Sequence, residues 1–214
     1  MENNDNFSEE ISFCENDLTE RLFNKYKSSK YLAIDTEAMG LYHGRDRLCL
    51  IQICNESDLI SCIKIEIGCR EATRIKDLLE DKKIKKIFHY ARFDVAALKC
   101  NLSIDTQNIF CTKVASKLAR TYTNKHGLKD LINELLGIEL DKSSQSSDWG
   151  SEENLSRDQI NYAANDVKYL IKAMEKLTLI LKREARYEIA QKCFNVIPIY
   201  SELDIKHYIN IFEH

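Results

Sequence analysis

Apolar runs of strand length alternate with amphipathic helical patterns along this chain of 214 residues, and their order is what most constrains the fold. The strand-like runs are residues 31–35, 48–54, 58–65 and 84–89. The helical patterns are a stretch from about residue 17 and the ranges 70–80, 91–100, 128–136 and 156–190. Because strands come first and helices are interleaved later, we predict an α/β domain with a central mixed sheet flanked by helices.

Two of the helical patterns carry end signals. Gly137 follows Leu136 directly, which is typical of a helix C-cap. Ser156 and Gln159 have the spacing of a capping box, which predicts that a helix begins there. These signals place helix ends on either side of a polar loop at residues 142–150.

The length of the chain predicts one domain over residues 1–214. We expect residues 1–15 to be flexible. The tail at residues 195–214 is rich in apolar side chains, so it either folds back on its own domain or packs at a subunit interface. The start of the chain is polar and acidic and unlike a signal peptide, and no apolar run approaches the roughly 18 residues of a membrane span.

The eight cysteines contain no Cys-x-x-Cys pair, and several lie in strand-like apolar runs. They therefore predict buried free thiols in a reducing compartment, that is, a cytoplasmic protein without membrane attachment. The net charge of −3 argues against binding long nucleic acids by phosphate neutralisation. Two bound divalent ions would bring the charge to about +1, which suits a short anionic substrate.

Four acidic residues and one tyrosine suggest a catalytic site. Asp35 and Glu37 are two residues apart on a predicted strand, so their side chains point to the same side. Tyr162 and Asp166 are about one helical turn apart and share a face, and Asp94 lies in a third segment. Gathered carboxylates repel one another unless a cation neutralises them, and hard oxygen ligands suit Mg²⁺ or Mn²⁺. Two such ions, about 4 Å apart, can promote phosphodiester cleavage, so we predict a metal-dependent nuclease.

The three segments resemble the three exonuclease motifs of the DEDD 3′-5′ exonucleases. They are Asp35-Thr-Glu37, Phe88-His-Tyr-Ala-Arg-Phe-Asp94 and Asn161-Tyr-Ala-Ala-Asn-Asp166. The position of Tyr162 resembles the tyrosine subclass, because the histidine subclass carries its histidine where this chain has Asn161. Segments from Gly127 to Trp149 are similar to ribonuclease D. The resemblance covers residues 30–180 and implies a ribonuclease H-like fold.

Further segments are similar to the nanoRNase C group, small diribonucleases within the ribonuclease D-like family. They are Arg45-Asp-Arg-Leu-Cys-Leu, Ile87-Phe-His-Tyr-Ala-Arg-Phe-Asp94, Arg120-Thr-Tyr-Thr-Asn-Lys-His-Gly127 and Cys193-Phe-Asn. This resemblance implies a homo-oligomer, an octamer as in that group, that acts on very short RNA such as dinucleotides. It also favours a subunit interface for the tail at residues 195–214. It also implies that the four carboxylates hold two metal ions and that the Tyr162 hydroxyl orients the attacking water.

Four further residues are candidates for substrate binding, each with a packing alternative. Leu41 follows the first motif, where it resembles a wedge between two terminal bases or simply packs the loop. His89 and Arg92 flank the second motif and either reach a phosphate or are satisfied within the fold. Trp149 either stacks on a base or covers the start of the following helix.

Three functions compete. The first is a diribonuclease that converts 5′-phosphorylated dinucleotides to mononucleotides. The second is a general 3′-5′ exonuclease that trims longer RNA or DNA with the same site. The third is a catalytically inactive module that binds nucleic acid, which the complete set of four carboxylates and a tyrosine argues against.

Overall fold

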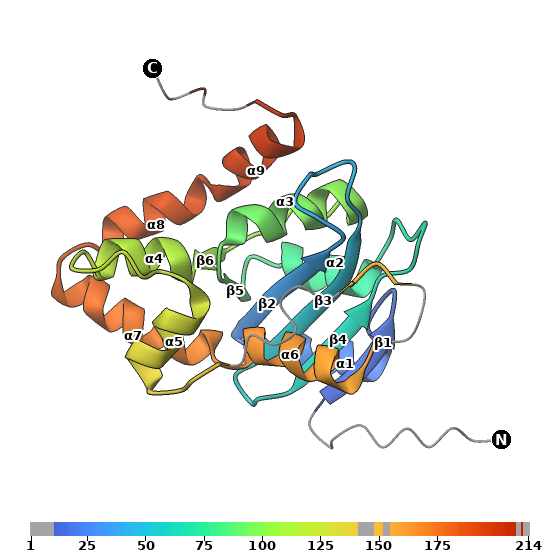
Figure 1. Ribbon diagram of the computed structural model, residues 1–214, viewed down its shortest axis with the longest axis horizontal. Helices are drawn as coiled ribbons and strands as arrows, with labels where there is room; N and C mark the ends of the chain where they lie inside the picture. Colours follow the sequence, from blue (N-terminus) through green and yellow to red (C-terminus); the bar gives the residue numbers. More distant parts are fainter. Residues whose placement is uncertain (1–10, 141–147, 152–154, 209–210, 212–214) are drawn as a thin grey trace.

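A six-stranded mixed sheet forms the centre of the computed structural model, which describes residues 11–140, 148–151, 155–208 and 211 (Figure 1). Its strands are β1 (Ile11–Glu15), β2 (Tyr31–Ala38), β3 (Leu48–Asn55), β4 (Ile60–Lys64), β5 (Lys85–Phe88) and β6 (Ile109–Cys111). They lie in the order β1-β4-β3-β2-β5-β6. β2, β3 and β4 pair antiparallel, whereas β1 pairs parallel with β4, and β5 pairs parallel with both β2 and β6. The predicted α/β fold with a mixed sheet is confirmed.

Strand β1 corrects the expectation that residues 1–15 are flexible. Residues 11–15 pair with residues 60–64 of β4 along the whole strand. The parallel pairing joins segments almost fifty residues apart, so local composition around residue 11 carries little sign of it. Residues 1–10 lie outside the described residues.

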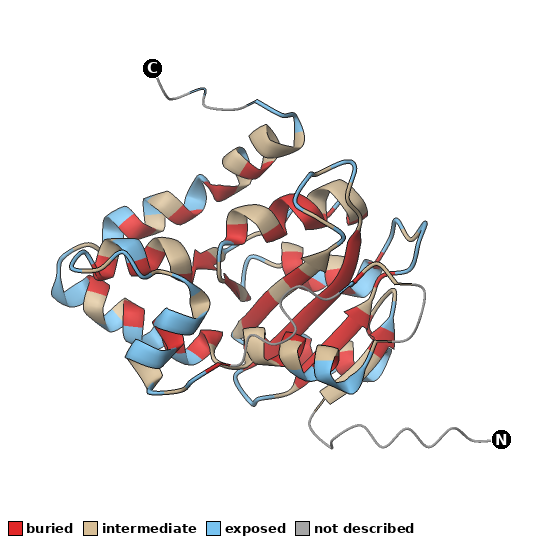
Figure 2. Cartoon of the chain, viewed as in Figure 1, coloured by how far each residue is buried: buried red, intermediate tan, exposed pale blue. Residues whose placement is uncertain are grey.

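Helices cover both faces of the sheet (Figure 1). They are α1 (Glu20–Lys27), α2 (Thr73–Glu80), α3 (Ala91–Leu102), α4 (Thr112–Ala119), α5 (Leu128–Leu136), α6 (Arg157–Lys168), α7 (Leu170–Arg183), α8 (Tyr187–Asn195) and α9 (Ile197–Ile205). α6 packs on β2, β3 and β4, and a small apolar cluster that includes Leu50, Cys62 and Ile160 lies beneath it. A larger core contains apolar side chains of the sheet and of the other helices, and buried residues run along β3 and most of β4 (Figure 2).

Both helix-end signals are confirmed. Gly137 caps α5 with a φ of 70°, in the left-handed region that glycine adopts at little cost. Ser156 forms the capping box with Gln159 at the start of α6. The long pattern at residues 156–190 is interrupted twice, at Tyr169 and around Ala185, whose φ is 54°. β6 and α4, whose ends meet without a loop, were not predicted.

The C-terminal segment packs on its own domain. Pro198 lies in the first turn of α9, where its missing N–H is tolerated. α9 packs against α3, and the Ser201 hydroxyl donates to the Arg92 carbonyl oxygen at 2.9 Å. For residues 197–205 the fold-back alternative is therefore the one observed, while a subunit interface remains a prediction. In the described part of the chain no helix is long and apolar enough to cross a membrane.

Candidate active site

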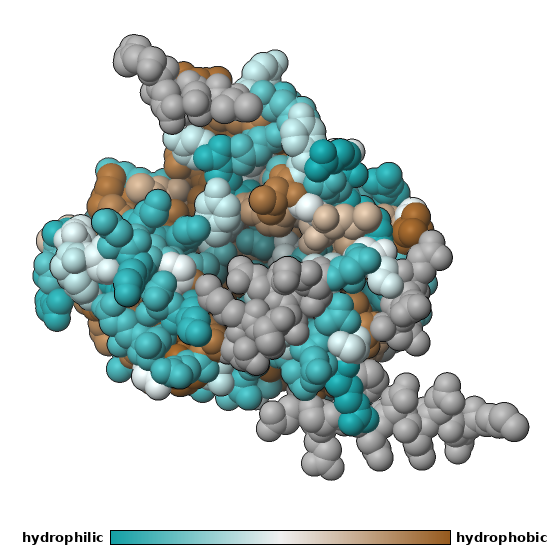
Figure 3. All heavy atoms as spheres, viewed as in Figure 1, coloured by the Kyte–Doolittle hydropathy of each residue, from teal (hydrophilic) through white to brown (hydrophobic). Residues whose placement is uncertain are grey.

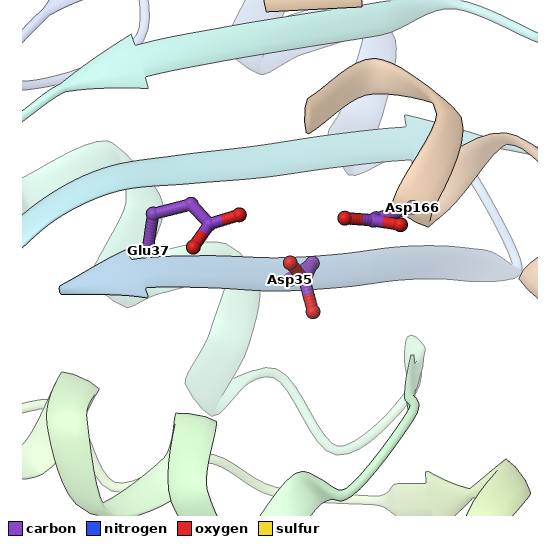
Figure 4. Close-up of side chains that lie close together, drawn as sticks. All are labelled: Asp35, Glu37 and Asp166. Atoms are coloured by element: carbon purple, nitrogen blue, oxygen red, sulfur yellow. The ribbon is translucent and has the colours of Figure 1, made fainter. Parts of the chain in front are cut away.

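Three carboxylates from two elements meet above the centre of the sheet (Figure 4). The buried run Leu32–Ile34 fixes β2 in the sheet, and alternation then places Asp35 and Glu37 on one face. α6 brings Asp166 to the same face, and one oxygen of each of the three carboxylates lies within 4.8 Å of the others. A register shift between Glu37 and Ala38 ends the regular pairing with β3 beside this group. The structure thus brings together three of the four predicted metal ligands as one cluster.

Asp94, the fourth predicted ligand, lies in the first turn of α3 and is 3% exposed. Its Oδ1 accepts a hydrogen bond from the Thr36 hydroxyl at 2.8 Å. Thr36 stands between Asp35 and Glu37 in sequence and points to the other face of β2, so it links the strand to α3. Sequence reasoning missed this role, because the two partners are 58 residues apart in the chain.

The carboxylates are held in an environment that disfavours their charge. Burial raises the pKa of Asp35 well above its ordinary value, and the charges of Asp94, Asp166 and Glu37 raise it further. Burial likewise raises the pKa of Glu37 to about 8 and that of Asp94 to about 7. A set of half-buried carboxylate oxygens with mutual repulsion is the donor set that suits a hard divalent cation such as Mg²⁺ or Mn²⁺.

Tyr162 lies one turn before Asp166 on α6, as predicted. Burial raises the pKa of its hydroxyl, the negative charges of Asp166, Glu37 and Asp35 raise it further, and the hydroxyl is hydrogen-bonded to Asp166. The phenol is therefore protonated at neutral pH and can donate a hydrogen bond but not act as a base.

Leu41 lies on the loop between β2 and β3 and is 83% exposed. Asp46 shapes this loop, because its Oδ2 accepts the Tyr42 backbone N–H at 2.9 Å and its carboxylate pairs with Arg45. In the space-filling view, apolar side chains are exposed over the loop (Figure 3). The loop borders a cavity of about 330 Å³. The cavity is lined by Leu41, Tyr42, His43, Tyr90, Arg92, Phe93, Asp204 and His207.

His89 is turned toward the interior. Its Nδ1 lies 2.9 Å from the Thr112 hydroxyl, and its Nε2 is buried without a hydrogen-bond partner among the described residues. Burial, followed by the charge of Lys113, lowers the pKa of the imidazole to about 4, so the ring is neutral at physiological pH. This placement favours the packing alternative over a phosphate contact.

Arg92 is paired within the chain. Its Nε and Nη2 donate to the two carboxylate oxygens of Asp204 at 2.5 and 2.6 Å, and its guanidinium lies 4.9 Å from the centre of the Tyr200 ring. The side chain nevertheless remains 41% exposed and borders the cavity beside Leu41. Any phosphate bound by Arg92 would share the guanidinium with Asp204.

Trp149 is only 6% exposed and lies in the apolar cluster beneath α6. The centre of its ring is 6.3 Å from that of Tyr162. The geometry favours the packing alternative, in which Trp149 supports the helix that carries Tyr162 and Asp166.

Tyr90 is a cavity residue that sequence reasoning missed. It precedes α3 with a φ of 79°, an uncommon conformation for a bulky side chain, and it remains 48% exposed. The Lys113 ammonium lies 4.2 Å from the centre of its ring. No sequence signal marks a tyrosine at this backbone conformation.

Comparison with known proteins assigns the family. The 3′-5′ exonuclease family model matches residues 11–182, which is most of the chain. The chain belongs to the 3′-5′ exonuclease family. It is 32% identical over 156 residues to ribonuclease D of Granulibacter bethesdensis, covering 73% of this chain and 39% of that enzyme. It is also 33% identical over 153 residues to DNA polymerase I of Aquifex aeolicus, covering 72% of this chain and 24% of the polymerase. This chain thus spans about two-fifths of the length of the ribonuclease D relatives.

Solved structures of similar length match this exonuclease over nearly the whole chain. Brucella melitensis NrnC bound to pGG is 44% identical with a TM-score of 0.90, over 95% of this chain and 98% of NrnC. NrnC with bound Mg²⁺ is 43% identical with a TM-score of 0.89, over the same shares. Escherichia coli RNase D shares the fold at 22% identity and a TM-score of 0.75, over 85% of this chain and 48% of RNase D. The predicted assignment to the ribonuclease D-like exonucleases, close to the nanoRNase C group, is confirmed.

Proposed function

We propose that this protein is a metal-dependent 3′-5′ exoribonuclease that hydrolyses very short RNA, above all 5′-phosphorylated dinucleotides, to mononucleotides. The observation that carries the proposal is the cluster of Asp35, Glu37 and Asp166 beside Asp94. The similarity to NrnC, which has been solved with pGG, supports a dinucleotide substrate.

Asp35, Glu37, Asp94 and Asp166 would hold two divalent ions, Mg²⁺ or Mn²⁺. When bound, the ions supply positive charge that stabilises the negative charge developing on the phosphodiester during cleavage. The solved complex of NrnC with Mg²⁺ supports this assignment. The carboxylates of this chain fit it as well, because bound cations would stabilise the charged form that burial disfavours.

Tyr162 would orient the attacking water. Its hydroxyl is protonated and hydrogen-bonded to Asp166, so its oxygen is free to accept a hydrogen bond from water. A water held there lies next to the carboxylate group. This positioning role leaves the phenolic proton in place.

The exposed loop between β2 and β3 would limit the length of the substrate. Leu41 would insert between the two bases of a dinucleotide, and the adjoining cavity of about 330 Å³ suits a small ligand. The runner-up is a general 3′-5′ exonuclease for longer RNA or DNA, which the ribonuclease D and DNA polymerase I relatives support.

A side-by-side time course on 5′-labelled RNAs of two and seven nucleotides tests the proposal. Enzyme is limiting, Mg²⁺ and Mn²⁺ are tried in turn, and Asp35→Asn serves as the blank. Rapid loss of the dinucleotide with the heptamer nearly untouched is the expected result. A regular ladder from the heptamer at a comparable rate would identify the general exonuclease, and no cleavage with either ion would favour an inactive binding module.

We further propose a homo-oligomer, an octamer as in the nanoRNase C group, located in the cytoplasm. All eight cysteines are free, which is in line with a reducing compartment. Exposed apolar side chains such as Val196 and Ile199 on the C-terminal segment support a subunit contact there. Light scattering after size-exclusion chromatography measures the subunit number, and a monomer at micromolar concentration would contradict the assembly.

A further inference from the structure

Gln52 is a fully buried amide without a visible role. It lies in the middle of β3 with no solvent exposure, and neither Nε2 nor Oε1 has a hydrogen-bond partner among the described residues. Buried amides are almost always hydrogen-bonded, because an unpaired buried polar group costs about 1–3 kcal/mol. An unpaired amide with both ends buried therefore requires an explanation.

The register of the sheet places this amide beside the carboxylates. Gln52 is the direct partner of Asp35 in the antiparallel pairing of β2 and β3. Directly opposite residues point to the same face, with Cβ atoms about 4.5–5.5 Å apart. α6, which carries Tyr162 and Asp166, packs over β2, β3 and β4 on this face. The Gln52 side chain thus lies in the layer that holds the carboxylate cluster.

The other neighbours on this face give the amide no structural reason to be polar. On β4 its partner is Cys62, which belongs to the apolar cluster beneath α6 with Leu50 and Ile160. An apolar side chain of the same size would fill this position without leaving an unpaired donor and acceptor. Carboxylates that bind cations, by contrast, need hydrogen-bond donors on their outer oxygens to fix their orientation.

We infer that Gln52 is a positioning residue of the active site, whose amide N–H donates to the carboxylate of Asp35 when divalent cations occupy the site. The inference rests on the proposed metal-dependent function, in which Asp35 is a metal ligand. Gln52 would orient the carboxylate of that ligand. The Gln52 carbonyl oxygen is then free to accept a hydrogen bond from a water in the same layer. Gln52 touches neither substrate nor cation in this role and acts through Asp35.

A Mg²⁺ titration of thermal stability, with no RNA present, tests the role of Gln52. Gln52→Met removes the amide at nearly constant volume. The matched control Thr106→Val removes a hydroxyl that is also buried and has no hydrogen-bond partner in the described part of the chain, and that lies near β6, the edge strand two places from β2. Without metal we expect both variants to melt at or above the wild-type temperature, because each loses an unpaired polar group. Gln52→Met should then need about 10–100-fold more Mg²⁺ to reach half of its stabilisation, whereas Thr106→Val titrates like wild type.

The same titration separates the possible failures. If Gln52→Met takes up Mg²⁺ at wild-type concentrations, Gln52 does not position the ligand and the inference is wrong. If Gln52→Met fails to fold without metal, the amide is a structural element of the sheet, which also contradicts the inference. If wild type itself shows no stabilisation by Mg²⁺ or Mn²⁺, the proposed metal-dependent function fails instead. A rise in the Mg²⁺ needed for cleavage of the dinucleotide, parallel to the shift in melting, supports the positioning role.

Discussion

The carboxylate cluster and the buried Arg120 differ in whether partners within the chain compensate their charge. Arg120 has no solvent exposure, and its guanidinium donates to Glu134, to the Ser116 hydroxyl at 2.9 Å and to the Lys125 carbonyl oxygen at 2.9 Å. Its charge is thus balanced inside the chain. Burial instead raises the pKa values of Asp35, Glu37 and Asp94, and the charges of neighbouring carboxylates raise those of Asp35 and Glu37 further. Balanced charge marks a structural element, whereas crowded like charge marks a site built for a ligand.

The same contrast appears in the direction of the pKa shifts. Hydrogen bonds from Arg120 and Tyr122 lower the pKa of Glu134, so its ionised form is favoured in the folded protein. For Glu37 and Asp94 the protonated form is favoured, unless a cation is supplied. Substitutions in the two regions should therefore affect different properties of the protein.

The largest effect should come from Asp35→Asn. Loss of this proposed metal ligand should remove several kcal/mol of transition-state stabilisation, so turnover of the dinucleotide should fall by at least about 10³-fold. Because the substitution relieves repulsion among carboxylates, the melting temperature in EDTA should stay the same or rise. Unchanged turnover in the folded variant would show that the cluster is not the catalytic site.

Arg120→Met should lower stability and leave turnover unchanged. It removes the buried guanidinium from its pair with Glu134, whose side chain is 40% exposed, and breaks two further hydrogen bonds of a charged group, which should lower the free energy of unfolding by about 3 kcal/mol in urea denaturation. Turnover per folded molecule should match wild type. A loss of turnover without a loss of stability would mean that this network belongs to the active site.

Tyr162→Phe should slow turnover by about 10²-fold while Mg²⁺-induced stabilisation is preserved, because only the hydroxyl that we propose to orient water is lost. Tyr122→Phe is the matched control, since its hydroxyl bonds Glu134 in the other region. It should leave turnover unchanged. Loss of Mg²⁺ stabilisation in Tyr162→Phe would assign this tyrosine to metal binding instead.

Stability without metal should depend on pH with opposite signs in the two regions. Glu37 and Asp94 have folded pKa values of about 8 and 7, above the ordinary range near 4, so the folded state binds more protons between pH 4 and 8. Their contribution is fully present below pH 4 and is lost as the pH rises through 7 and 8. The lowered pKa of Glu134 gives a contribution that is lost as the pH falls below 4.

Melting curves in EDTA from pH 5.5 to 8.5 measure the first effect. We expect the melting temperature to fall with rising pH, and saturating Mg²⁺ to flatten the curve. Glu37→Gln should weaken the fall, whereas Glu134→Gln should leave the slope in this range unchanged. A wild-type curve that rises with pH would contradict the assignment of raised pKa values to the cluster.

The smallest effect should come from Asp204→Asn. It weakens the bidentate pair with Arg92 that ties α9 to α3, and because both side chains are partly exposed the loss should be about 1 kcal/mol or less. Hydrogen exchange should detect faster opening of α9 than of α5, which lies near Arg120. Uniform exchange in both helices would show that the pair does not hold the C-terminal segment.

The sequence was sufficient to predict the helices, strands and caps whose signals are local. Strands β2 and β3, helix α5 and the caps at Gly137 and Ser156 were predicted close to their observed bounds, because alternation, helical spacing and cap chemistry act over a few residues. β1 was missed because its partner lies some fifty residues away. The breaks around Tyr169 and Ala185 depend on packing rather than on any proline or glycine there.

In the site, too, the features that depend on local spacing were predicted, and those that depend on distant segments were not. Asp35 and Glu37 share a face by alternation alone, and motif spacing identified Asp94, Tyr162 and Asp166. Three roles depend on register or on distant chain segments and could not be read from spacing. They are the hydrogen bond from Thr36 to Asp94, the position of Gln52 opposite Asp35, and the pairing of Arg92 with Asp204 across 112 residues.

The hydrogen-bonded loop between β2 and β3 also affects how much conformational entropy the backbone loses when a substrate binds. Asp46 accepts a backbone N–H from Tyr42, and the backbone N–H groups of Arg45 and Asp46 donate to the Tyr42 carbonyl oxygen, so hydrogen bonds within the loop order its backbone. Ordering a free loop costs about 1 kcal/mol or more per residue, whereas here the order is acquired when the chain folds. Leu41 is therefore presented to solvent in a fixed place, and a ligand that contacts it gains that contact without first ordering the backbone.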